Sequence, residues 1–207
     1  AGLSFGGKFR VDQENYSSNP GGRSAAKGSA GEVWISGTYG KLSMGDVDGA
    51  ANAAVGHVDG VGLTGLGDLN ESTFLANGGN DLDADGDITG SNEVEDPSAL
   101  YTYSAGDLNL YISSTNPADN LDLAYAVGVK YAIGNVSVSA AYEHNNDQDG
   151  APSDIDQYFV GVTGTFGAVT AKAVYGQADS LGVTADQFAV SLTYSADALA
   201  VTAVYTD

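Results

Sequence analysis

The feature that most constrains the fold is an alternation of apolar and polar residues, which runs from residue 98 to the end of the chain. In one segment the apolar positions are Tyr125, Val127, Val129, Tyr131 and Ile133. Successive side chains of a β-strand point to opposite faces, so the pattern predicts strands with one apolar and one polar face. With similar segments near the start, eleven strands are expected, at residues 3–11, 32–38, 41–46, 98–104, 108–114, 122–133, 136–144, 156–166, 169–177, 186–194 and 199–206. Three apolar residues fall on the polar face instead, namely Tyr111, Phe159 and Val174.

The connections between the predicted strands alternate between short and long. Tight turns are expected at residues 38–41, 104–107, 133–136, 166–169 and 195–198. Long, polar and acidic loops are expected at residues 12–31, 47–97, 113–121, 143–157 and 176–186. A soluble sandwich has no reason to sort its loops by length, whereas an outer-membrane barrel has short turns at one rim and long loops at the other. The connections therefore favour a transmembrane barrel.

Aromatic residues gather at both ends of the predicted strands. Near the short turns lie Tyr103, Tyr131, Phe166 and Tyr194, and near the long loops lie Tyr125, Tyr142, Tyr158, Tyr175 and Tyr205. Two aromatic girdles are typical of the two membrane interfaces of a barrel. The chain is therefore predicted to be all-β, a transmembrane antiparallel β-barrel. Because bacterial barrels have an even number of strands, residues 1–207 are interpreted as an internal piece of one longer barrel domain.

Composition excludes several classes of function. The 207 residues include 27 acids and 7 bases, which gives a net charge of -20 and argues against a nucleic-acid partner. Cysteine is absent, so thiolate metal sites and cysteine nucleophiles are excluded. Neither His57 nor His144 is arranged with a serine and a carboxylate for catalysis, so no catalytic residues are expected. The alternatives are a secreted, calcium-stabilised adhesin domain and an outer-membrane lipase.

Four stretches of the sequence resemble one known family. They are GLSFGGKF at 2–9, EVWISGTYGKLSMGD at 32–46, GGND at 78–81 and EDPSALYTYSAG at 95–106. They are similar to the general-diffusion porins of alphaproteobacteria, of the Rhodobacter type. The resemblance implies a sixteen-stranded barrel and a homotrimer in the outer membrane of a Gram-negative bacterium, in contact with lipid and lipopolysaccharide. It implies passive diffusion of ions and small hydrophilic solutes through a water-filled channel, with this chain supplying strands three to thirteen.

The resemblance also implies roles for particular segments. In such porins the loop that matches residues 47–97 folds into the barrel and narrows the channel. The barrel wall of such porins is lower where subunits meet, so the short predicted strands 32–38 and 41–46 are expected in the trimer interface.

The loop at 47–97 is acidic throughout. No base occurs from residue 42 to 129, and the eleven acids of the loop are Asp48, Asp59, Asp68, Glu71, Asp81, Asp83, Asp85, Asp87, Glu93, Glu95 and Asp96. A constriction lined by carboxylates favours cations. The residues predicted to line it are Asp68, Glu71, Asp81, Glu93, Glu95 and Asp96 on the loop, with Lys8 and Arg10 on the wall. Lys8 and Arg10 fall on the polar face, where they either create a transverse field or are simply solvated, as do Lys130 and Lys172.

Residues 80–90, with the sequence NDLDADGDITG, resemble the calcium loop of a helix-loop-helix sensor. Two observations argue against a sensor, because Asn92 occupies the place of the bidentate acid and no amphipathic helix flanks the loop. The cluster Asp81, Asp83, Asp85 and Asp87 then has three interpretations: a non-sensor calcium site, carboxyls that hold protons through raised pKa values, or a solvated tip. Calcium is the only cofactor that the sequence suggests.

Overall fold

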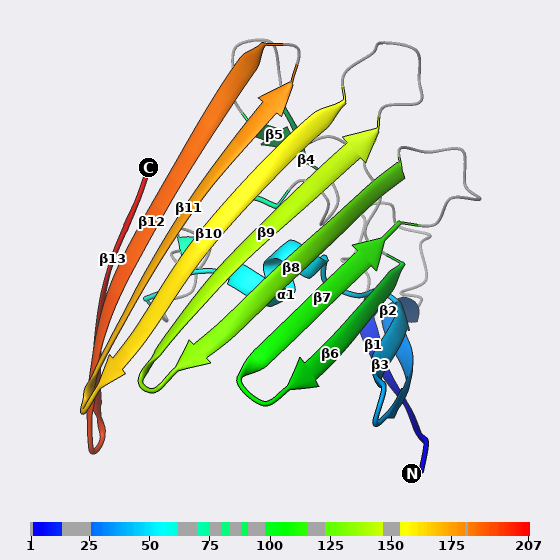
Figure 1. Cartoon of the computed structure of the whole chain (residues 1–207), viewed down its shortest axis with the longest axis horizontal. Coiled ribbons are helices and arrows are strands. Elements are labelled where there is room, and N and C mark those ends of the chain that lie inside the picture. Colours follow the sequence, from blue (N-terminus) through cyan, green and yellow to red (C-terminus); the bar gives the residue numbers. More distant parts are fainter. Residues whose placement is uncertain are drawn as a thin grey trace, which may run out of the picture.

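The computed structural model describes residues 2–13, 26–61, 70–74, 80–82, 88–90, 98–115, 123–146, 154–180 and 182–207. Its main element is an antiparallel sheet of eleven strands, in which each strand lies beside its neighbours in the chain (Figure 1). The strands are β1 (Ser4–Gln13), β2 (Ala26–Gly37), β3 (Gly40–Gly45), β6 (Ala99–Ala105), β7 (Leu108–Ser114), β8 (Leu123–Ile133), β9 (Val136–Asn146), β10 (Ile155–Phe166), β11 (Val169–Ser180), β12 (Val183–Ala196) and β13 (Leu199–Thr206). The prediction of eleven wall strands is confirmed, while a total of sixteen stays a prediction.

The short connections are tight hairpins, as predicted. Three of them contain a glycine in the left-handed region, with φ of 62° at Gly106, 60° at Gly134 and 63° at Gly167. A side chain at such a φ is unfavourable for most residues, so glycine favours these turns. In the last hairpin Asp197 takes this conformation, with φ of 50°, and aspartate tolerates it better than most residues.

Two of the predicted long connections are wrong in extent. The long loop expected at 176–186 is not present, because β11 continues to Ser180 and β12 already begins at Val183, with pairing up to these two residues. Strand β2 begins at Ala26 rather than at residue 32, because its pairing with β1 continues to Gln13 beyond a register shift between Arg10 and Val11. The segment AKGSAG has no apolar alternation, so the pattern did not reveal it. With 12 residues, β2 is not a short strand, whereas β3 has 6 and β6 and β7 have 7 each. The argument that placed 32–38 in a trimer interface because it is short therefore fails.

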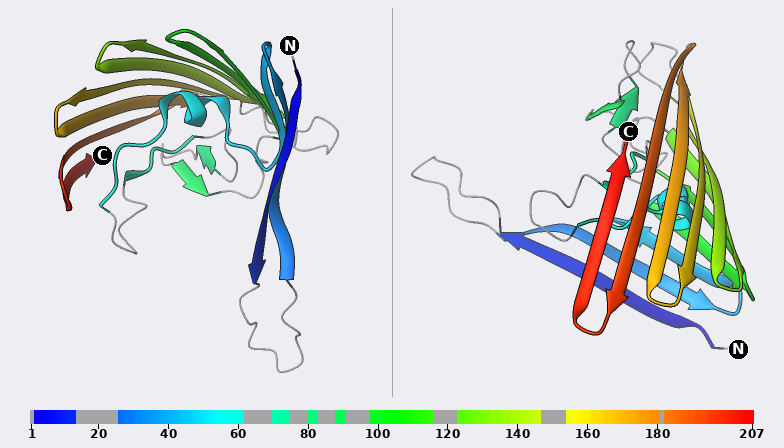
Figure 2. Two further views of the ribbon diagram at one scale, coloured as in Figure 1. Left: turned by 90° about the horizontal axis from the view of Figure 1, so that it is seen from below. Right: turned by 90° about the vertical axis from the view of Figure 1, so that its left-hand side faces the viewer.

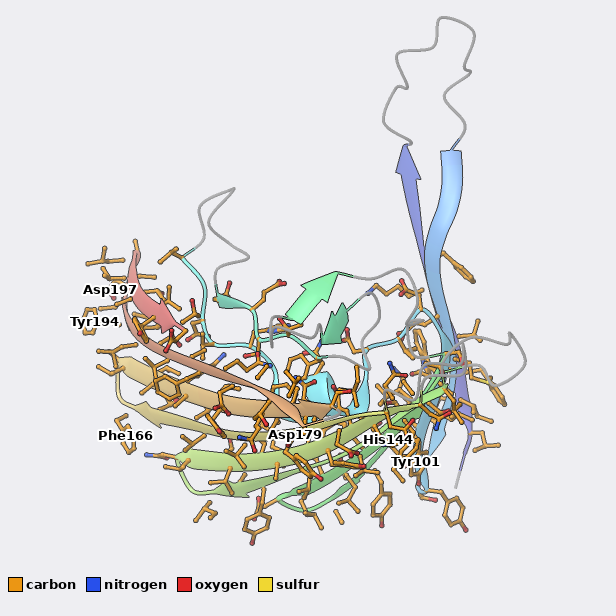
Figure 3. The ribbon with its side chains drawn as sticks, turned by 90° about the horizontal axis from the view of Figure 1, so that it is seen from above. Tyr101, His144, Phe166, Asp179, Tyr194 and Asp197 are labelled. Atoms are coloured by element: carbon orange, nitrogen blue, oxygen red, sulfur yellow. The ribbon has the colours of Figure 1, made fainter. Side chains whose placement is uncertain are left out.

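The two faces of the sheet differ in chemistry. Large apolar side chains alternate along the convex face and are exposed, among them Val127, Val160, Leu192 and Tyr205. Figure 3 shows the rings of Phe166 and Tyr194 on this outer side. The opposite, concave face carries polar or small residues, many of them buried, such as Ser113, Gln157 and Ser191. The outward direction of the apolar series is therefore confirmed.

The described parts of the segment between β3 and β6 lie on the concave side of the sheet (Figure 2). It contains α1 (Ala50–Val55), the sole α-helix of the described ranges, and a small hairpin of β4 (Asn80–Leu82) and β5 (Ile88–Gly90). Within the described residues no helix has the length and apolar character that a membrane span requires. The predicted long loop thus has its described parts on the face of the sheet that carries the polar residues.

Candidate functional site

The helix α1 lies directly on the concave face. It packs against β7, β8, β9 and β10, and its residues Ala50, Ala51 and Ala54 are almost completely buried. The first residue is held by a hydrogen bond, in which the backbone N–H of Ala50 donates to Ser113 Oγ at 2.8 Å. Because Ser113 lies on β7, this bond fixes the start of the helix to the wall.

An ion pair holds the chain a few residues after the helix. Lys172 Nζ on β11 lies 2.5 Å from Asp59 Oδ1, and Thr193 Oγ1 donates to Asp59 Oδ2 at 3.0 Å. The backbone N–H of Asp59 donates to Ser191 Oγ at 2.9 Å. Both oxygens of the carboxylate are therefore bound to the wall, and one cation of the concave face is neutralised.

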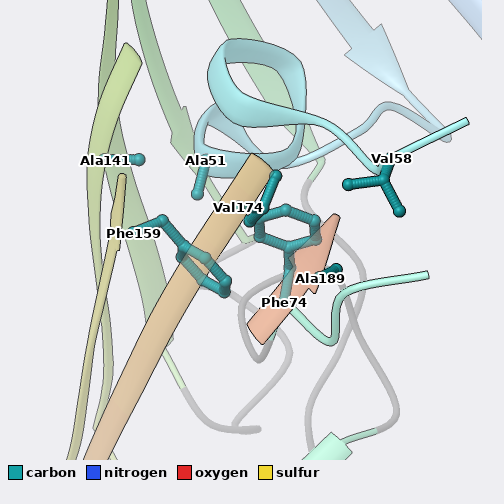
Figure 4. Close-up of a cluster of buried hydrophobic side chains, with 7 residues drawn as sticks. All are labelled: Ala51, Val58, Phe74, Ala141, Phe159, Val174 and Ala189. Carbon is teal, nitrogen blue, oxygen red and sulfur yellow. The ribbon is translucent and has the colours of Figure 1, made fainter. Parts of the chain in front are cut away.

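A third attachment lies at residues 70–74, where two glutamines of the wall hydrogen-bond to the backbone of Thr73. The N–H of Thr73 donates to Gln187 Oε1 at 2.8 Å. Its carbonyl accepts from Gln157 Nε2 and from Gln187 Nε2, both at 2.9 Å. The next residue, Phe74, packs on Phe159 with ring centroids 4.4 Å apart (Figure 4). The segment is therefore held by paired hydrogen bonds and by a buried aromatic contact.

Apolar residues of the wall complete this contact. The cluster around the two rings contains Ala51, Val58, Phe74, Ala141, Phe159, Val174 and Ala189. Phe159 and Val174 are two of the three apolar residues that broke the alternation, and both are almost fully buried. The third, Tyr111, packs against the small cluster of Ala50, Ala124 and Ala126. The exceptions to the pattern therefore lie where the loop covers the wall.

His57 joins two parts of the loop to each other. Its Nδ1 accepts a hydrogen bond from the N–H of Ser72 at 3.0 Å, and its ring meets Phe74 edge-on at 5.4 Å. Burial lowers the pKa of His57, an effect that the nearby charges of Glu71 and Asp48 oppose. An imidazole that accepts at Nδ1 is neutral and carries its single ring N–H proton on Nε2. The low pKa is therefore consistent with the observed hydrogen bond.

The predicted constriction residues are placed only in part. Glu71 is exposed on the loop, and Lys8 is exposed on β1, opposite Glu32 in the β1–β2 register. Arg10 and Asp81 lie within β1 and β4, and their side chains are outside the part of the chain that the structure describes. The remaining predicted residues lie outside the described ranges: Asp68, Glu93, Glu95 and Asp96 of the constriction, and Asp83, Asp85 and Asp87 of the calcium cluster. The arrangement of acids opposite bases at a narrow section of the channel therefore stays a prediction.

Several contacts of polar side chains were not predicted. Lys41 was expected where the turn at 38–41 meets the strand at 41–46, and no contact was predicted for it. Its Nζ lies 3.8 Å from Glu32 Oε1 and 4.7 Å from the ring centroid of Trp34. The attachment of the loop through Gln157, Gln187 and Ser191 was also missed. Strand parity would have put these three on the polar face, but nothing in the sequence identified their partners. In the described ranges no group of three or more His, Cys, Asp or Glu residues could hold a metal ion.

Comparison with known proteins gives consistent matches. A family model described as Gram-negative porin matches residues 1–207. A porin of Rhodobacter capsulatus is 32% identical over 186 residues, which cover 84% of this chain and 55% of that protein. A porin of Fuscovulum blasticum is 25% identical over 214 residues, covering 100% of this chain and 69% of that one. The chain thus spans about half of the length of the first of these relatives.

Solved structures share the fold. A porin refined at 1.8 Å resolution superimposes with a TM-score of 0.67 at 26% identity, covering 85% of this chain and 64% of that one. A triple mutant of Rhodopseudomonas blastica porin gives a TM-score of 0.61 at 20% identity, covering 100% of this chain and 69% of that one. The second likeness concerns the fold alone.

Proposed function

Because the chain belongs to the Gram-negative porin family, we propose that its sheet is part of the wall of an outer-membrane β-barrel that encloses a water-filled channel. The observation that carries the proposal is the difference between the two faces. Exposed apolar side chains cover the convex face, while the concave face is polar and holds the loop in three places. A sheet with this arrangement suits lipid outside and water inside.

The loop is the element that would narrow the channel. Its described parts lie on the concave face and stay there through contacts with β7, β10, β11 and β12. The solutes would be ions and small hydrophilic molecules, which diffuse passively, and no catalytic step is involved. The outer face would contact lipid and, at the long-loop rim, lipopolysaccharide.

The constriction would prefer cations. The loop at 47–97 contains eleven acids and no base, and the chain as a whole has a net charge of -20. Lys172 offsets one of these acids, Asp59, so it adds little to the field in the channel. Glu71 is exposed and stays available to passing ions. Calcium at Asp81, Asp83, Asp85 and Asp87 and a homotrimeric assembly are further parts of the proposal.

The test is electrical. The full-length protein is purified in detergent and added to a planar lipid bilayer, where stepwise, ohmic conductance increases are expected. Reversal potentials in asymmetric KCl should show preference for K⁺, more strongly at low salt where screening is weak. A protein that remains soluble without detergent and gives no conductance steps would contradict the channel and favour a secreted adhesin domain. Conductance with preference for chloride would contradict only the cation preference.

A further inference from the structure

The contact between α1 and the wall is made by unusually small residues. On the helix these are Ala50, Ala51 and Ala54, each at most 1% exposed. On the wall the facing cluster includes Ala124 and Ala126, which are equally buried. Because no longer side chain stands between the two elements, the backbone of the helix lies close to the sheet.

Gly128 on β8 makes the closest approach possible. A Cβ atom placed on Gly128 would lie 2.6 Å from Ala54 Cβ and 2.7 Å from the carbonyl oxygen of Ala50. Carbon atoms in contact are normally about 3.5–4.0 Å apart, so a methyl group has no room here. Gly128 is not among the glycines with positive φ. Its backbone would accept any residue, and it is the lack of space that requires glycine.

The row of residues around Gly128 forms a trough that fits the helix. In the sheet register Tyr111 on β7 lies opposite Gly128, Gly128 opposite Ala141 on β9, and Ala141 opposite Phe159 on β10. Along this row a large residue is followed by two small residues and then by a second large one. The two rings form the sides, and the two small residues form the floor on which α1 rests.

A second glycine supports the same reading. A Cβ atom placed on Gly161 of β10 would lie 3.0 Å from Val55 Cγ1 at the end of the helix and 2.7 Å from Ser139 Oγ. These two atoms are ends of side chains, so this position is more tolerant than Gly128, where one of the two atoms met is a carbonyl oxygen of the helix backbone. Gly128 is therefore the position at which bulk must move the helix itself.

We propose that Gly128 is a positioning residue that sets the width of the channel, because it lets α1 lie directly on the wall. This inference rests on the proposed function. The wall strand is hydrogen-bonded on both sides, to β7 and to β9, so it resists displacement. The opposite side of the helix faces the concave space. A side chain at position 128 therefore pushes α1 by about 1 Å or more into the channel.

The experiment compares single-channel recordings of the full-length protein with those of Gly128→Ala and Gly128→Val. The conductance is expected to fall in the order wild type, Ala, Val, and the largest neutral polymer that enters the channel should become smaller in the same order. The sign of the ion preference should stay unchanged, because no charge is altered. A fall in stability alone would leave the conductance of correctly folded channels unchanged.

Two further variants keep the result interpretable. Gly164→Ala adds the same methyl group on β10, where it would meet the ring of Phe166 on the outer face, and should conduct like the wild type. Ala54→Val adds bulk from the helix side without altering the sheet, and should narrow the channel even where Gly128 variants fail to fold. Wild-type conductance with an unchanged polymer limit in folded Gly128→Ala or Ala54→Val overturns the inference. Absence of conductance in the wild type overturns the proposed function instead.

Discussion

Asp59 and Lys172 form an ion pair of 2.5 Å between the loop and β11. Both side chains retain about 30% exposure, so water screens the pair, and exposed ion pairs contribute only about 0–1 kcal/mol to stability. The importance of the pair is therefore positional. It determines where the chain leaves the helix and crosses the concave face toward β12, where Ser191 and Thr193 bind the same residue.

Replacing Lys172 by Met should weaken this attachment, leaving only the hydrogen bonds of Asp59 with Ser191 and Thr193. We expect more frequent closures and larger open-channel noise in single-channel recordings, because the end of the loop segment can move. The unfolding free energy should change by about 1 kcal/mol or less. Lys130→Met is the matched control, since Lys130 is also on the concave face but lies in no ion pair within the described ranges. Equal noise in both variants would mean that the ion pair does not hold the loop.

Hydrogen exchange should distinguish the roles of the two glutamines that bind Thr73. Gln187 accepts from the Thr73 N–H, whereas Gln157 donates to the Thr73 carbonyl. The amide of Thr73 should therefore exchange faster in Gln187→Leu and remain protected in Gln157→Leu. Each variant should also lose about 1–3 kcal/mol of stability, because a polar group is left with fewer partners. Equal protection of Thr73 in both variants would show that the amide is shielded by burial and not by Gln187.

Acid should loosen the segment at 70–74. The pKa of His57 is lower in the folded protein than its ordinary value, so the unfolded chain binds more protons as the pH falls. This contribution to stability is present above the ordinary histidine pKa of about 6.5 and is lost as the pH falls through the folded value. Protonation at Nδ1 also removes the acceptor of the Ser72 N–H. We expect faster exchange of the Ser72 amide at pH 5 than at pH 7.5, after correction for the intrinsic rate.

The control for this prediction is His57→Asn. The amide oxygen of asparagine can accept a hydrogen bond in place of Nδ1 but does not titrate in this range. The pH dependence of protection at Ser72 should therefore disappear. If it persists, a group other than His57 is responsible for it.

Neutralising Asp81, Asp83, Asp85 and Asp87 together by Asn tests the acidic loop. The preference for cations should decrease, and most at low salt, because screening is weakest there. Reversal potentials are measured with and without a calcium chelator. A chelator effect in the wild type that is absent in the variant would support calcium binding. Unchanged selectivity under all conditions would place this cluster away from the path of the ions.

The wall could be predicted because its signal is local. Alternation along a strand needs no knowledge of partners, and glycine-containing turns such as those at Gly106 and Gly134 mark the hairpins. The start of β2 could not be predicted, because Ala26 and its neighbours have small or polar side chains and are included through pairing with β1. Local patterns detect strands with two different faces, and they miss strands that lack this difference.

The attachment of the loop to the wall could not be predicted from such patterns. The pairs Asp59–Lys172 and Thr73–Gln187 join residues that are distant in sequence, so no spacing rule connects them. One indirect signal was present, because Tyr111, Phe159 and Val174 were apolar on a face that was expected to be polar. The structure explains them by the cover that the loop provides. Apolar residues on the wet face of a barrel strand therefore indicate where something packs against the wall.

The anchors of the loop have a consequence for the order of folding. Asp59 bonds to Ser191 and Thr193, which lie 132 and 134 residues further along the chain. Contacts of such separation form late, since the intervening chain must first be ordered. The segment that follows β3 therefore cannot form these contacts until β10, β11 and β12 have joined the sheet. We expect that the wall is assembled around an unobstructed lumen and that the channel acquires its final bore only when these last strands are in place.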